Sequence, residues 1–133
     1  MLYRKIASKI ESFLKSEKKR MLVVSGARQV GKSYIIREVG MRLYSNFIEV
    51  NMEEDKQSNR LFENARTVED FMIALSTIAG AKMKDSEKTL VFIDEIQAYS
   101  HLLTLAKFLV EDGRFTYIAS GSQLGIALKT TQS

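Results

Sequence analysis

The stretch that constrains this chain most is an apolar segment that runs directly into a glycine-rich loop. Residues 21–25 read Met-Leu-Val-Val-Ser, residues 26–33 read Gly-Ala-Arg-Gln-Val-Gly-Lys-Ser, and apolar residues then recur at helical spacing. A loop that wraps a polyphosphate needs glycine wherever a Cβ would keep backbone N–H groups away from the oxygens. Gly26 and Gly31 meet that need, so the segment predicts a strand, a phosphate-binding loop and a helix in succession.

The residue types of the loop predict a role for most of its positions. The residues expected to surround the phosphates are Gly26, Ala27, Arg28, Gln29, Val30, Gly31, Lys32 and Ser33. Lys32 would reach the β- and γ-phosphates, Ser33 would place its hydroxyl on Mg²⁺, and the helix that begins near Gly31 would direct its positive dipole end at the same anion. A plain glycine turn beside a lysine is the competing interpretation, and the strand and helix on either side favour the phosphate site.

A second chemical segment is the run Leu-Val-Phe-Ile-Asp-Glu at residues 90–95, a buried strand that ends in two carboxylates. Ligands of open α/β sheets bind at the carboxyl ends of the strands. There, Asp94 could hold Mg²⁺ through water while Glu95 polarises the water that attacks the γ-phosphorus. An acidic residue at a strand end is often ordinary surface chemistry, but its position downstream of a phosphate loop favours the functional interpretation.

Hydroxyl groups follow the next predicted strand, at residues 115–119. A hydroxyl at this edge could bond the attacking water or a γ-phosphate oxygen. We favour Ser120 over Ser122 because it lies closer to the strand end. A Ser/Gly turn that caps a following helix is an equally good account of the same residues.

Apolar periodicity predicts the remaining elements. Helices are expected at residues 2–17, 32–44, 68–79 and 101–112, with a short helix at 57–64 and a further strand at 47–50. Thr67 and Asp70 fit a capping box at the start of the 68–79 helix. The acidic residues 53–55 are expected in a solvated loop, although they could also contact metal-bound water.

Composition limits the class of protein. A chain of 133 residues suits one domain with a real core, and 45% hydrophobic with 27% charged residues indicates a globular fold. No apolar run approaches the ~20 residues of a membrane span, and no signal-peptide block begins the chain, so we expect a cytoplasmic protein. Zero cysteines exclude disulfides, and His101 is the single histidine, which makes a zinc site improbable.

The positive charge is concentrated at the N-terminus. The formal net charge is +4, and residues 1–20 hold seven Lys/Arg against two Glu, which gives 7 − 2 = +5 and leaves −1 for the rest. Such a segment could contact nucleic acid or an acidic protein surface. We prefer the alternative that it is the solvated face of an amphipathic helix.

Three segments together resemble a known family. They are the loop at residues 26–33, Phe-Ile-Asp-Glu-Ile-Gln at 92–97 and Ser-Gly-Ser-Gln-Leu-Gly at 120–125. In this order they resemble the AAA-type P-loop ATPases of bacteria and archaea, which usually carry a C-terminal domain of unknown function. The resemblance covers the chain from about residue 3 to residue 129.

This resemblance implies an α/β, three-layer fold with a parallel sheet in the order 5-1-4-3-2. It implies roles for Gly26, Gly31, Lys32 and Ser33 as phosphate and Mg²⁺ ligands, Asp94 and Glu95 as metal holder and base, and Ser120 or Ser122 as sensor. Such ATPases continue past the sensor into a fifth strand. We therefore expect residues 1–133 to be one ATPase core, truncated at its C-terminal side, that lacks strand 5 and any trans-acting arginine.

Binding and hydrolysis of Mg-ATP is the function that these segments favour, with Glu95, Lys32 and Ser120 as catalytic residues. Guanine nucleotide is disfavoured because no Asn-Lys-x-Asp segment follows. A kinase is disfavoured because the Asp-Glu pair suits water activation better than transfer to a hydroxyl. The alternative is a nucleotide-gated binding module that hydrolyses little and contacts nucleic acid or a protein through its basic N-terminal segment.

Without strand 5, residues 21–25 would lie at the edge of the sheet. An apolar edge with unpaired N–H and C=O groups invites another chain to pair with it. We therefore expect either an oligomer formed through that edge or an N-terminal helix that shields it, and we prefer the helix. We also expect ATP hydrolysis to be slow.

Overall fold

Four parallel strands form the centre of the computed structural model, which describes residues 2–16, 20–26 and 31–122. The strands are β1 (Met21–Ser25), β2 (Asn46–Asn51), β3 (Thr89–Asp94) and β4 (Thr116–Gly121). Their order in the sheet is β1-β4-β3-β2, and every neighbouring pair is parallel. The α/β class and the expected order 1-4-3-2 are therefore confirmed, and within the described ranges no strand pairs with the outer edge of β1.

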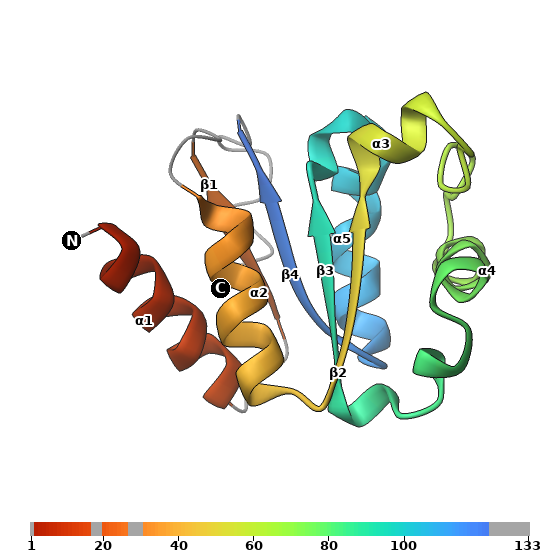
Figure 1. The fold of residues 1–133 in the computed structure, drawn as a ribbon. Helices are drawn as coiled ribbons and strands as arrows, with labels where there is room; N and C mark the ends of the chain where they lie inside the picture. The colour runs from red at the N-terminus through yellow and green to blue at the C-terminus, as the bar shows by residue number, and fades with distance from the viewer. Residues whose placement is uncertain (1, 17–19, 27–30, 123–133) are drawn as a thin grey trace.

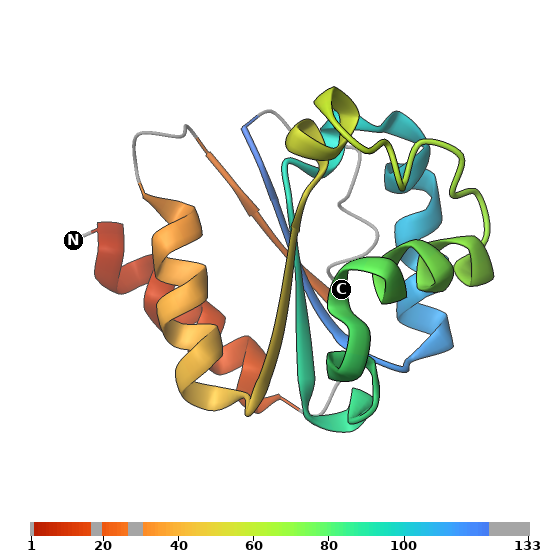
Figure 2. The ribbon, with the colours of Figure 1, turned by 45° about the vertical axis from the view of Figure 1, so that its right-hand side comes forward.

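Helices cover both faces of this sheet and make three layers (Figure 2). Helices α1 (Leu2–Lys15) and α2 (Lys32–Leu43) lie on one face, and α4 (Val68–Ala79) and α5 (Ser100–Asp112) lie on the other. Parallel strands need crossover connections, and those connections supply the helices. The central strand β3 is buried along its whole length because both of its faces are covered.

Each face of the sheet has its own hydrophobic cluster. Along β3, Val91 and Ile93 join the cluster under α4 and α5, whereas Leu90 and Phe92 join the cluster under α1 and α2. This alternation is the period of two that a strand imposes on its side chains. It explains why the continuous apolar run in the sequence forms a strand that is buried on both sides.

Helix α1 contributes its apolar side to the second of these clusters. Ile10 is fully buried, and Phe13 and Leu14 are buried with it against residues of α2 and Val24 of β1. Figure 1 shows α1 lying along α2. Helix α1 therefore covers α2 and one face of β1. The backbone N–H and C=O groups at the outer edge of β1 can be paired only by another strand. That α1 shields this edge stays a prediction.

The contact between α2 and the sheet is close at Gly40. A Cβ at this position would lie 2.8 Å from Leu90 Cδ2 and 2.9 Å from Phe47 Cε1. Side chains at such distances would have to shift, so the approach of α2 to β2 and β3 depends on the missing side chain.

The region between β2 and α4 differs from the prediction. A short helix, α3 (Met52–Gln57), begins directly after β2, and its first turn contains the acidic residues 53–55. The prediction of a solvated loop for these acids was therefore wrong, and so was the prediction of a helix at 57–64, where turns follow α3. Asn51 starts α3, because its side chain accepts a hydrogen bond from the Glu54 backbone N–H at 3.0 Å.

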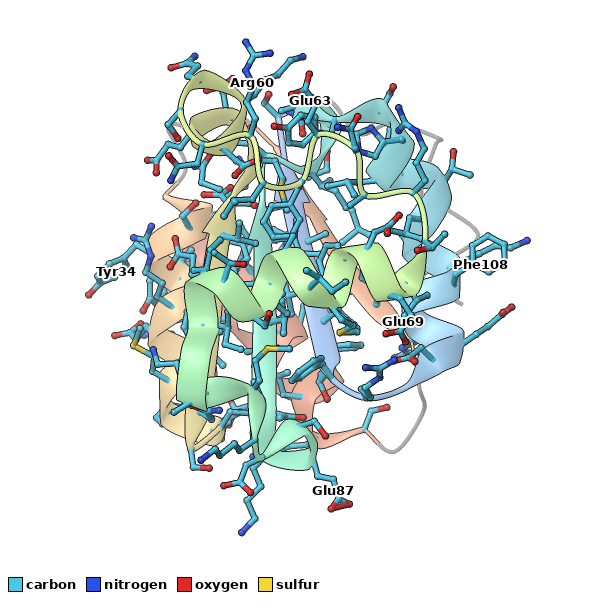
Figure 3. All side chains as sticks on the ribbon, turned by 90° about the vertical axis from the view of Figure 1, so that its right-hand side faces the viewer. Tyr34, Arg60, Glu63, Glu69, Glu87 and Phe108 are labelled. Atoms are coloured by element: carbon cyan, nitrogen blue, oxygen red, sulfur yellow. The ribbon has the colours of Figure 1, made fainter. Side chains whose placement is uncertain are left out.

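The other elements follow the sequence pattern closely. Helix α4 has the predicted bounds, and its capping box is formed by Thr67 and Asp70. The polar connection before β3 contains two short 3₁₀ helices, η2 (Gly80–Met83) and η3 (Ser86–Lys88). Figure 3 looks onto the α4 side, where Phe108 of α5 projects outward and is 45% exposed. No helix in the described ranges is both long and apolar enough to cross a bilayer.

Candidate functional site

All four strands end at the same edge of the sheet, at the top of Figure 1, where the predicted chemical segments meet. Gly26 follows β1 with a φ of 149°, and Gly31 precedes α2 with a φ of 68°. A Cβ at Gly31 would meet no atom of the described residues within 4 Å. Within the protein, glycine is thus favoured there by its left-handed backbone rather than by crowding. The predicted loop residues Ala27, Arg28, Gln29 and Val30 lie outside the described residues.

The first turn of α2 brings Lys32 and Ser33 to this edge. Lys32 is only 2% exposed, which is rare for a lysine. Ser33 Oγ donates a hydrogen bond of 3.0 Å to Asp94 Oδ2 at the end of β3. The structure therefore joins the phosphate-loop residues to the first of the two predicted carboxylates, although 61 positions separate them in the sequence.

Asp94 also accepts a hydrogen bond from the neighbouring strand. Ser120 Oγ donates to Asp94 Oδ1 at 2.6 Å, and Ser120 is fully buried. Ile93 lies opposite Ala119 in the parallel register, so the next residues, Asp94 and Ser120, come together as well. Ser120 and Gly121 belong to β4 rather than to the predicted turn after it. The Ser120 hydroxyl therefore orients the Asp94 carboxylate, and it does not line the pocket described next.

The two adjacent carboxylates face one pocket because the chain turns sharply between them. Successive side chains of an extended strand point to opposite faces. Glu95 has φ 52° and ψ 49°, a left-handed conformation, and a 3₁₀ helix, η4 (Ile96–Ala98), follows it. Such a conformation costs a non-glycine residue roughly 1–3 kcal/mol. Because of this turn, Asp94 and Glu95 line the same pocket, and each of the two residues is 5% exposed.

The pocket has a volume of about 310 Å³. The residues that line it are Gly31, Lys32, Ser33, Asn51, Glu53, Glu54, Gln57, Asp94 and Glu95. Four of these come from the end of β2 and from α3. For Glu53 and Glu54 a role near the metal was only the alternative interpretation, and Asn51 and Gln57 were not predicted as site residues. A pocket of about 340 Å³ opens at the other end of the strands beside Arg20 and Thr116, and none of the predicted site residues lines it.

The pocket combines one lysine and one hydroxyl with several carboxylates. Carboxylate and hydroxyl oxygens are hard ligands of the kind that Mg²⁺ prefers. A lysine and a helix N-terminus attract phosphate. Together these groups suit a polyphosphate bound with a divalent cation, in which the cation offsets the repulsion between the phosphates and the acids.

Comparison with known proteins agrees with this geometry. A sequence profile for AAA domains matches residues 18–133. The chain belongs to the AAA domain family. This confirms the resemblance to AAA-type proteins and identifies the chain as a nucleotide-binding AAA-type module.

The fold of this AAA domain is also found in a solved structure, that of PCH-2 from C. elegans. The two structures superpose with a TM-score of 0.59 at 16% sequence identity over 98% of this chain. The AAA domain described here spans 39% of the length of the PCH-2 chain. At this identity the likeness concerns the fold alone. No curated protein matches the sequence.

One wall of the AAA domain's pocket is tied to the segment that carries Glu95. Asp55 of α3 is buried, and it accepts two backbone N–H groups of the following turn at 3.0 Å and the Tyr99 hydroxyl at 2.8 Å. Burial, followed by this hydrogen bond to Asp55, raises the pKa of Tyr99. Lys56 Nζ donates to the Ala98 carbonyl at 3.0 Å. Helix α3 and the segment after β3 therefore form one connected unit around the pocket.

Gln97 is a further residue that the sequence reasoning did not single out. Its Nε2 donates to Glu95 Oε1 at 2.8 Å. It is the last residue of the segment Phe-Ile-Asp-Glu-Ile-Gln. No signal in the sequence marked it, because the contact with Glu95 depends on the left-handed turn at Glu95, which only the structure shows.

Proposed function

We propose that this AAA domain binds Mg-ATP and hydrolyses it. The observation that carries the proposal is the convergence of two segments on one pocket: Lys32 and Ser33 at the start of α2, and the pair Asp94 and Glu95 at the end of β3. The hydrogen bond of 3.0 Å between Ser33 and Asp94 supports a shared role for these two residues.

In the proposed complex, Lys32 binds the β- and γ-phosphates, and the N-terminus of α2 adds backbone N–H groups. Ser33 Oγ and Asp94 are the residues that would hold Mg²⁺, and their oxygen atoms fit that ion. When bound, the ion would neutralise charge on the phosphate oxygens. Glu95 accepts a proton from the attacking water, and burial of the pocket strengthens these electrostatic contacts.

The first test separates binding from turnover. Lys32→Ala is expected to abolish ATP binding, because it removes the buried cation. Glu95→Gln keeps the shape of the side chain and is expected to retain binding while lowering turnover about 10²–10⁴-fold, the usual contribution of a general base. Calorimetry measures the affinity for ATP, and release of inorganic phosphate measures the turnover.

Lys88→Ala is a suitable control for the same experiment. Lys88 is exposed and directly precedes β3, at the end of the strand away from the pocket. It should change neither affinity nor turnover. Unchanged ATP affinity in Lys32→Ala would refute the assignment of the loop, and an unchanged rate in Glu95→Gln would refute the assignment of the base.

A nucleotide-gated binding module remains the second candidate. The observation that favours it is the outer face of α1, where Arg4, Lys5 and Lys9 are exposed and form no ion pair with any described residue. Glu11 instead pairs with Lys15 at 3.1 Å and with Arg42 at 3.7 Å. Phosphate release measured with and without nucleic acid distinguishes the two candidates, because only the module should depend on a partner.

A further inference from the structure

The side chain of Gln97 supports the Glu95 carboxylate without lining the pocket itself. The hydrogen bond from Gln97 Nε2 to Glu95 Oε1 is 2.8 Å long, and Glu95 lines the pocket whereas Gln97 does not. Contact with the general base of the proposed reaction, from outside the binding surface, is the geometry of a residue that orients another residue.

The chemistry of the pair fixes which end of the Gln97 amide faces Glu95. An ionised carboxylate only accepts hydrogen bonds, so the amide must present its NH₂ group to it. The amide oxygen is then turned away from Glu95. The orientation of Gln97 is thus assigned by this one interaction.

The other end of the Gln97 amide makes no hydrogen bond. Its Oε1 is buried and has no partner among the described residues. A buried acceptor without a partner is unfavourable for stability. A glutamine that served packing alone would be better replaced by an apolar side chain of the same length, so its amide points to a role in the site.

The backbone at Glu95 adds a reason for such support. Its left-handed conformation places the residue between the end of β3 and the 3₁₀ helix η4, outside the ladder that holds Asp94. Asp94 has two hydroxyl donors from neighbouring elements, Ser33 and Ser120. Gln97 supplies Glu95 with a donor of its own from within η4.

We propose that Gln97 is a positioning residue for the general base: its amide N–H holds the Glu95 carboxylate in the direction from which it accepts a proton from the attacking water. This inference rests on the proposed function. It adds that the rate of hydrolysis, and not the affinity for ATP, depends on Gln97.

Gln97→Met tests the inference, because methionine matches the length of glutamine, removes the donor and also removes the unpaired acceptor. We expect the rate constant of phosphate release to fall about 10–100-fold, as is usual when a supporting hydrogen bond to an active group is lost. Single turnovers with protein in excess over labelled ATP give this rate even if it is slow. The ATP affinity and the midpoint of thermal unfolding should not fall. If Gln97 had only a structural role, the thermal midpoint would fall together with the rate.

A double-mutant cycle with Glu95→Gln distinguishes the possible failures. Because Gln97 acts through Glu95, Gln97→Met should have no further effect on the rate in the Glu95→Gln background. An unchanged or higher rate in Gln97→Met, or an equal loss in both backgrounds, overturns the inference alone. A wild-type rate in Glu95→Gln overturns the proposed base and the inference with it.

Discussion

Asp94 is the residue on which most of the candidate site depends. Its two carboxylate oxygens each accept one hydroxyl, from Ser33 at 3.0 Å and from Ser120 at 2.6 Å. The sequence predicted all three residues from their places after strands and in the loop. It favoured Ser120 over Ser122 only from closeness to the strand end, because the contact with Asp94 depends on the pairing register of β3 and β4, which are separated by a whole helix.

The Ser120 hydroxyl should therefore matter for stability and for turnover. Ser120→Ala leaves a buried carboxylate with one donor fewer, and a hydrogen bond to a charged group contributes about 1.5–3 kcal/mol. We expect a loss of this size in the free energy of unfolding, measured with urea, together with slower phosphate release because Asp94 is less well oriented. Ser122→Ala, at the partly exposed position after β4, is the control and should behave like the wild type. Equal effects of both substitutions would contradict the role given to Ser120.

At the scale of elements, strands and long helices were predictable, whereas α3 was not. Helices such as α4 carry both an apolar period and a capping box, so two independent signals agree. Helix α3 has six residues and consists mainly of charged and polar side chains, so no apolar period marks it. Its position depends on Asp55, whose carboxylate bonds Tyr99 more than 40 positions away in the sequence.

Helix α1 should be essential for a monomeric fold. Deletion of residues 1–17 removes Ile10, Phe13 and Leu14 from their cluster and exposes the apolar faces of α2 and β1. Exposed apolar surface of this kind promotes association. We expect the truncated chain to form oligomers or aggregates in sedimentation, while Lys5→Ala with Lys9→Ala, on the exposed face of α1, leaves the intact chain unchanged. A truncated chain that stays monomeric and soluble would show that α1 is dispensable.

At the scale of the whole molecule, the sequence predicted the sheet topology, because one motif limits which strands can end beside each other. A phosphate loop after the first strand and an acidic pair after another require these strands to end at one edge. The order β1-β4-β3-β2 itself came from the resemblance to AAA-type ATPases and is confirmed. Periodicity along the chain could not have given it, because a crossover can place a strand on either side of its predecessor.

Helix α2, which carries Lys32 and Ser33 at its start, packs closely on the sheet at Gly40. From Gly40 to Lys32 the helix rises over eight residues, a lever of about 12 Å. A methyl group at Gly40 would lie 2.8 Å from Leu90 Cδ2 and 2.9 Å from Phe47 Cε1, so either these side chains shift or the helix tilts and moves its N-terminal end. Gly40, near one end of the sheet, thus influences the position of Lys32 and Ser33 at the other end without contacting them.

We therefore expect Gly40→Ala to lower the ATP affinity measured by calorimetry, besides an overpacking cost of about 1–3 kcal/mol in the free energy of unfolding. Met41→Ala changes the exposed neighbour on the same helix and should alter neither quantity. If Gly40→Ala were less stable but bound ATP like the wild type, the side chains around residue 40 would have shifted locally and helix α2 would not have tilted as a whole. If the ATP affinity falls as well, the position of Lys32 depends on how closely α2 packs against Leu90 and Phe47 at the opposite end of the domain.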